Sequence, residues 1–262
     1  MRTWGHWLAA AAFFAATPAL AHTSYLKPNV FSAGPGVERV SIEAAFTENF
    51  PQPDGPVESQ DFHLYQPDAR RDVYDNIAVL SQMTVLENDL TEPGTYLFSS
   101  GERLGRTGLQ GLIDGQWRPL DPDEPPPPGV RTRQTQTATV ANVYVTKGAT
   151  SNGVLGVHVG TLEIMPLTHP SAICMDDGFR VRVLMSGRAL ANQEINLDRD
   201  GGAYDATPFH QVLRTDAAGE ALIHFDRPGI YLAMVRASGD APAGAATPIR
   251  SYTTSLTFEV SR

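Results

Sequence analysis

The chain has 262 residues and a formal net charge of −9 at pH 7, from 20 Lys and Arg against 29 Asp and Glu. We therefore expect neither nucleic acid nor an anionic membrane as a partner, because both repel an acidic protein. Cys174 is the single cysteine, so no intramolecular disulfide forms and the core must hold the fold. Gly and Pro are abundant, at 23 and 20 residues, and separate short alternating apolar runs. That composition predicts an all-β fold.

Residues 1–21 resemble a secretory signal peptide. Arg2 supplies a basic start, residues 7–16 form an apolar stretch, and Ala19-Leu20-Ala21 matches an A-x-A cleavage site. Cleavage after Ala21 would place the protein in the periplasm and make His22 its first residue. The apolar stretch is too short to span a bilayer and no second one follows, so we expect the mature chain not to span a membrane.

Alternation of apolar and polar residues predicts strands along both halves of the chain. In the N-terminal half, the expected strands are 37–46, 62–66, 77–86, 94–100, 108–113 and 135–144. Residues 119–129 include four consecutive prolines, which predict a surface loop. In the C-terminal half, the expected strands are 161–165, 179–185, 194–197, 211–214, 221–225, 229–236 and 255–260.

These strands predict two β-sandwich domains, at residues 22–160 and 161–262. The second has the short strands and regular turns of an immunoglobulin-like or transthyretin-like sandwich, the class that includes carboxypeptidase-regulatory-like modules. A short internal repeat supports the division, because the pattern P-G-x-Y-L occurs at 93–97 and again at 228–232. In Greek-key sandwiches such a tyrosine commonly hydrogen-bonds back to the backbone, so Tyr96 and Tyr231 are predicted to be packing residues.

The sequence contains none of the common catalytic motifs, so we expect no enzyme activity. Histidine remains as the candidate chemistry. A cleaved His22 would carry an α-amine and an imidazole, a chelating pair for Ni, Co or Cu as a divalent ion. His169, held between Thr168 and Pro170, is the first choice for a further ligand. His63, on the face opposite Phe62 and Leu64, is the second.

The mature chain resembles a family of exported proteins described as periplasmic components of cobalt/nickel transport, domain-of-unknown-function family 4198. The matching segments are 21–22 with Pro28, 45–47, 92–96, 114–117, 143–148, 162–170, 187–191, 215–219 and 252–259. The resemblance implies an envelope accessory of transition-metal uptake that exchanges its ion with an inner- or outer-membrane transporter. Of the family's histidines, those at the mature start and in Pro-Leu-Thr-His-Pro correspond to His22 and His169.

Two other functions stay open. A non-catalytic sandwich would bind an envelope protein or a glycan through loops and edge strands, without metal. A copper oxidase would use the N-terminal histidine as a brace, although the sequence offers no second brace motif. The positions of the histidines around the His22 amine would separate these readings.

Overall fold

The alternating runs form strands in the computed structural model, which describes residues 22–201, 204 and 209–262. The predicted signal peptide therefore lies outside the described residues. The described strands are β1 (Thr23–Pro28), β2 (Ser32–Ala33), β3 (Arg39–Thr47), β4 (Gly55–Pro56), β5 (His63–Tyr65), β6 (Arg71–Asp72), β7 (Asn76–Val79), β8 (Thr84–Asp89), β9 (Gly94–Ser99), β10 (Arg103–Ile113), β11 (Gln116–Pro119), β12 (Thr132–Lys147), β13 (Leu162–Pro166), β14 (Phe179–Met185), β15 (Arg188–Ala189), β16 (Glu194–Arg199), β17 (His210–Arg214), β18 (Glu220–Ile223), β19 (Gly229–Asp240) and β20 (Ile249–Val260). Two 3₁₀ turns accompany them, η1 (Gly153–Gly156) and η2 (Pro170–Ala172).

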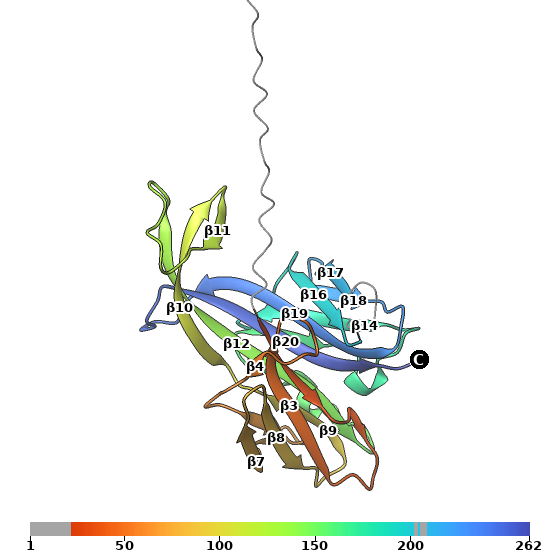
Figure 1. Cartoon of the computed structure of the whole chain (residues 1–262). Coiled ribbons are helices and arrows are strands. Elements are labelled where there is room, and N and C mark those ends of the chain that lie inside the picture. Colours follow the sequence, from red (N-terminus) through yellow and green to blue (C-terminus); the bar gives the residue numbers. More distant parts are fainter. Residues whose placement is uncertain (1–21, 202–203, 205–208) are drawn as a thin grey trace, which may run out of the picture.

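The strands form three sheets. The first sheet has the order β1-β3-β8-β7, with β4 added to β3. The central sheet runs β17-β16-β19-β20-β12-β9-β5-β6, and β2 and the β10–β11 hairpin also pair with this sheet. The third sheet contains β13, β14, β15 and β18. Figure 1 shows the long strands β12, β19 and β20 crossing the molecule, while β10 and β11 project from it as an arm.

One order of strands occurs twice. In the N-terminal half, β1-β3-β8 face β6-β5-β9-β12, and in the C-terminal half β13-β14-β18 face β17-β16-β19-β20. Both halves match the strand order of immunoglobulin-like sandwiches. The last strands of the two halves, β12 and β20, pair in parallel from Thr135–Ile249 to Val143–Thr257. The prediction of an all-β fold built from sandwiches is confirmed, and the division at residues 160 and 161 stays a prediction.

Each face of the central sheet carries a hydrophobic core. Ala141, Val143 and Val145 of β12 belong to the core shared with the first sheet. Val140 and Tyr144, on the opposite face of the same strand, belong to the core shared with the third sheet. β12 therefore alternates between two cores, as a strand covered on both faces must.

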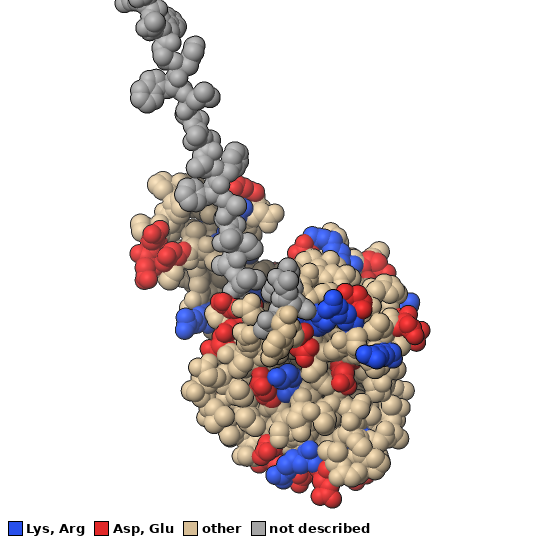
Figure 2. All heavy atoms as spheres, turned by 45° about the vertical axis from the view of Figure 1, so that its right-hand side comes forward, with Lys and Arg blue, Asp and Glu red and all other residues tan. Residues whose placement is uncertain are grey.

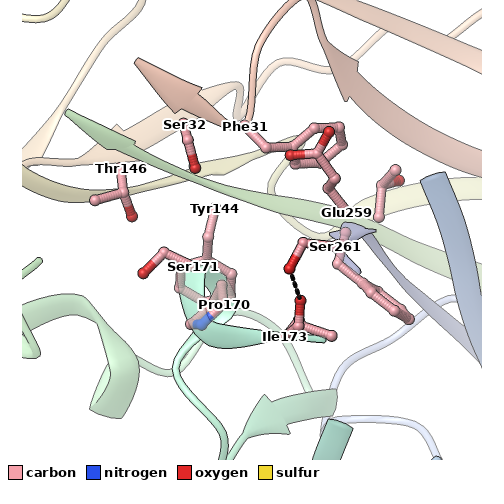
Figure 3. Close-up of a pocket in the computed structure, with 11 residues that line it drawn as sticks. Phe31, Ser32, Tyr144, Thr146, Pro170, Ser171, Ile173, Glu259 and Ser261 are labelled. Atoms are coloured by element: carbon pink, nitrogen blue, oxygen red, sulfur yellow. Dashed lines mark hydrogen bonds between the residues drawn. The ribbon is translucent and has the colours of Figure 1, made fainter. Parts of the chain in front are cut away.

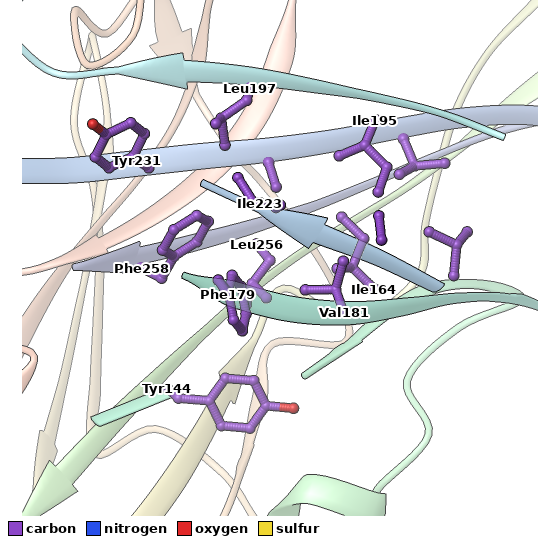
Figure 4. Packing of buried hydrophobic residues seen from close by; sticks show 14 of the residues in the cluster. Tyr144, Ile164, Phe179, Val181, Ile195, Leu197, Ile223, Tyr231, Leu256 and Phe258 are labelled. Carbon is purple, nitrogen blue, oxygen red and sulfur yellow. The ribbon is translucent and has the colours of Figure 1, made fainter. Parts of the chain in front are cut away.

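The core beneath the third sheet is centred on aromatic rings, several of which are labelled in Figure 4. The ring of Phe258 lies 4.7 Å from that of Phe179 and 5.9 Å from that of Tyr231. The Phe225 ring is 5.9 Å from Phe258 and 4.8 Å from Tyr231. Such offset and edge-to-face pairs add to the free energy gained by burial alone.

Three expectations about the elements need correction or extension. The single strand expected at 77–86 is two strands, β7 and β8, because the chain turns between Leu80 and Met83, where the Leu80 N–H donates to the Met83 carbonyl at 2.8 Å. β1 was not expected, since it is buried almost throughout and shows no alternation. β10 begins at Arg103, well before the expected 108. The proline-rich segment is confirmed as a loop between β11 and β12.

Candidate functional site

His22 lies beside a carboxylate because of the register of the first sheet. β1 and β3 pair antiparallel from Thr23–Thr47 onward, so the next opposed positions are His22 and Glu48. The His22 Nε2 atom is 3.4 Å from Oε1 of Glu48, and both side chains are about half exposed. The Glu48 N–H donates to Oδ2 of Asp54 at 2.6 Å, which fixes the turn that carries the carboxylate.

This arrangement suits a ligating histidine. A histidine that binds metal through one ring nitrogen commonly directs the other toward a carboxylate, which fixes the ring and its tautomer. With Nε2 turned to Glu48, Nδ1 is the nitrogen left to act with an α-amine on the same residue. The Arg236 guanidinium lies beside the residue that follows His22, with its Nη2 3.5 Å from Oγ1 of Thr23. Burial lowers the pKa of Arg236.

His63 lies inside the molecule. It pairs with Ser99 of β9 and is 3% exposed. The ring Nδ1–H donates to the Asp61 carbonyl at 2.6 Å, since a carbonyl can only accept. Burial lowers the pKa of the ring, which favours neutral imidazole. Phe62 and Leu64 are buried too, so the opposite face expected for His63 is also covered.

His169 uses both ring nitrogens in local hydrogen bonds. It precedes η2, and its Nδ1 accepts from the Ser171 N–H at 3.2 Å. The Nε2 atom is 3.2 Å from the Ser151 carbonyl oxygen and therefore carries the proton. Oγ1 of Thr95, on β9, is 3.1 Å from the same nitrogen. The imidazole thus ties η2 to the N-terminal half.

The structure does not bring the three predicted ligands together. His63 contacts the end of β9 at Ser99 and His169 its start at Thr95, and four residues of strand span roughly 13 Å. Within residues 22–201, 204 and 209–262, no group of three or more His, Cys, Asp or Glu is placed to hold a metal ion. Glu48 was not predicted, because it adjoins His22 only through the register of β1 with β3, and β1 itself was not expected.

On the face seen in Figure 2, basic and acidic side chains are interspersed among neutral residues. None of the described residues forms a helix long and apolar enough to cross a membrane.

Comparisons with known proteins place the chain in a family. No curated protein matches it. Among solved structures, the D0-D1 domain of intimin is 14% identical with a TM-score of 0.22, covering 91% of this chain and 99% of that one. The human OSCAR ligand-binding domain is 15% identical with a TM-score of 0.19, covering 88% of this chain and 95% of that one. A family model described as a domain of unknown function, DUF4198, matches residues 19–239. The chain therefore belongs to the DUF4198 family.

Proposed function

We propose that the mature protein is a periplasmic accessory of transition-metal uptake that carries a divalent ion on its first residue. The observation behind the proposal is the 3.4 Å contact between Nε2 of His22 and the Glu48 carboxylate. It orients the imidazole so that Nδ1 and the α-amine can chelate one ion. His63 and His169 are left out, because their ring nitrogens take part in hydrogen bonds within the fold.

The donor set favours particular ions. An amine and an imidazole are nitrogen ligands suited to Ni, Co and Cu rather than to Mg or Ca. Half-exposed ligands leave room for water or for a ligand from a transporter, which suits a cargo ion that must be released. Nickel or cobalt is proposed as the cargo, in line with the resemblance described above, and copper is the competing ion to include in every titration.

The first test is the mature N-terminus. Sequencing of the exported protein should begin at His22, and a start elsewhere would remove the α-amine from the site. The mature protein is then titrated with Ni²⁺, Co²⁺ and Cu²⁺ by calorimetry. Two changes are compared with it: His22→Ala, and one alanine inserted before His22. The insertion keeps the imidazole but displaces the amine, so both should weaken binding at least about tenfold.

His210→Ala is the matched control. Nδ1 of His210 is 2.8 Å from Oδ1 of Asp198, so it is another exposed histidine beside a carboxylate, without an adjacent amine. Its loss should leave the titration unchanged. Equal binding by the wild-type protein and both N-terminal changes would overturn the proposal.

An exposed edge favours a second function, that of a module binding an envelope protein or a glycan. β7 ends the first sheet, and Ile77, Val79 and Leu80 at this edge are 45%, 54% and 52% exposed. An apolar edge strand is a ready template for a strand from another protein. This second function predicts that a Val79→Cys protein can be crosslinked to an envelope partner at this edge. The yield of the crosslink should stay the same when a chelator removes metal.

A further inference from the structure

A small cavity opens where the last strands of the two halves separate. The parallel pairing of β12 and β20 ends at Val143–Thr257. Beyond this point Thr146 of β12 pairs instead with Ser32 of β2, and β20 continues alongside β19. The cavity lies in this fork and measures about 70 Å³. Figure 3 shows its walls, in which the Ser261 hydroxyl donates to the Ile173 carbonyl at 3.1 Å.

The lining is aromatic and oxygen-rich. The aromatic wall comes from Phe31, Tyr144 and Phe258. Oxygen atoms come from Thr257 and Glu259, on one face of β20, and from Ser261 just after that strand. Ser32, Thr146 and Ser171 supply the others. The lining contains one carboxylate and no Lys, Arg or His. A bound group should therefore be a cation rather than an anion.

Thr257 and Glu259 stand out among these side chains because no described hydrogen bond engages either of them. Thr257 is 1% exposed, and its Oγ1 is buried without a hydrogen bond in the described part of the chain. A buried hydroxyl without a partner is costly, and native proteins rarely retain one. Glu259 is exposed and enters no described hydrogen bond or ion pair. Glu259 thus presents a free carboxylate to the cavity, and Thr257 contributes to its wall a residue whose hydroxyl has no partner.

We propose that this cavity binds a primary ammonium group, from a free alkylamine or from a lysine side chain. The carboxylate supplies the opposite charge, the hydroxyls accept N–H groups, and the aromatic rings attract a cation through their faces. At roughly 10–15 Å³ per water-sized group, the volume holds about five such groups, the size of a butylammonium ion. A sugar ring is too large. The proposal is independent of metal binding at His22.

The test uses the ¹⁵N-labelled mature protein and n-butylammonium, with n-butanol as the neutral probe of the same shape. Backbone amides of Ser32, Thr146 and residues 257–261 should shift and saturate with a dissociation constant of about 1 mM or below. Butanol should leave them in place. Equal shifts with butanol, or shifts that do not saturate near the cavity, would overturn the proposal.

Two variants assign the interaction to Glu259 and Thr257. Glu259→Gln should weaken binding about tenfold, since it removes the charge but keeps the shape. Glu124→Gln, an exposed position in the proline-rich loop, is the matched control and should bind like the wild type. Thr257→Val should bind roughly threefold more weakly. Its folding stability should be maintained, because the hydroxyl makes no hydrogen bond. Unchanged binding by Glu259→Gln would contradict the proposal.

A last comparison identifies the source of the ammonium group. N-acetyl-lysine methylamide carries the same group on a peptide backbone. Binding as tight as that of butylammonium assigns the cavity to a lysine of a partner protein. Binding of butylammonium alone assigns it to a free amine. Failure of both ligands would refute the proposal and leave the metal titration at His22 unaffected.

Discussion

Tyr96 and Tyr231 occupy equivalent corners in the two halves of the molecule. Tyr96 lies in β9 and Tyr231 in β19, the strands that precede the last strand in each copy of the common order. Their hydroxyls donate to the carbonyl oxygens of Glu92 and Arg227, four residues upstream, at 2.7 Å in both cases. The repeated pattern P-G-x-Y-L therefore marks one structural device used twice.

Removing either hydroxyl should destabilise the fold. Tyr96 also accepts the Glu92 N–H at 2.9 Å, so Tyr96→Phe leaves two backbone groups without a partner and should cost about 1–3 kcal/mol. Tyr231→Phe should cost about 1–2 kcal/mol. Tyr65→Phe, whose hydroxyl has no described hydrogen bond, is the control. Urea unfolding is followed by far-UV circular dichroism, because Trp117, the one tryptophan after residue 21, reports on the projecting arm. Identical midpoints for Tyr96→Phe and the wild type would contradict this account.

Phe258 should be among the most sensitive positions in the core. Its ring contacts those of Phe179, Phe225 and Tyr231, so Phe258→Ala opens a cavity and should cost about 3–5 kcal/mol. Leu222→Ala, at a side chain that is 40% exposed, should change the free energy of unfolding by less than about 0.5 kcal/mol. Equal losses at both positions would mean that the aromatic cluster is not a stabilising centre.

His63 should make the protein less stable in mild acid. Burial lowers its pKa in the folded state below the ordinary value of 6.5, so the unfolded chain binds the proton more readily. The contribution of His63 to stability is therefore full above about pH 6.5 and falls as the pH drops toward the folded-state pKa. His63→Asn keeps a donor for the Asp61 carbonyl and should flatten this dependence in urea midpoints measured from pH 8 to pH 5.5. His224→Gln, an exposed control, should retain the slope of the wild type.

Glu48 should influence metal binding without being required for folding. If it orients the His22 ring, Glu48→Gln should weaken Ni²⁺ or Co²⁺ binding about 10–100-fold while leaving the unfolding midpoint unchanged. Asp198→Asn, at the carboxylate that pairs with His210, should have no effect on binding. A full-affinity Glu48→Gln protein would show that the contact with His22 is incidental.

Local alternation predicted strands well where one face is distinct from the other. β14 begins and ends at the predicted residues 179 and 185, because its buried and more accessible side chains largely alternate. β1 shows no alternation, because it is covered on both faces. The pairing of β12 with β20 joins residues over a hundred positions apart in the sequence. The parallel pairing joins the two halves into one sheet and has no local signature.

The candidate sites depend on such distant pairings. The approach of His22 to Glu48 follows from the register of β1 with β3, and the cavity follows from the point at which β20 leaves β12. The sequence identified His22 through the predicted cleavage site, which is a local signal. It could not show that the His169 ring caps η2 and bonds to Ser151, because both contacts require the folded chain.

The alternation along β12 makes that strand intolerant of changes in length. One extra residue near Val140 would turn every later side chain of β12 to the opposite face. Val143 and Val145 would then point toward the core that now contains Tyr144, and Tyr144 toward the core that now contains the valines. Both halves would lose their packing from a single insertion. The tip of the β10–β11 arm, at Asp114 and Gly115, faces no such constraint and is the natural place to graft a foreign loop or label.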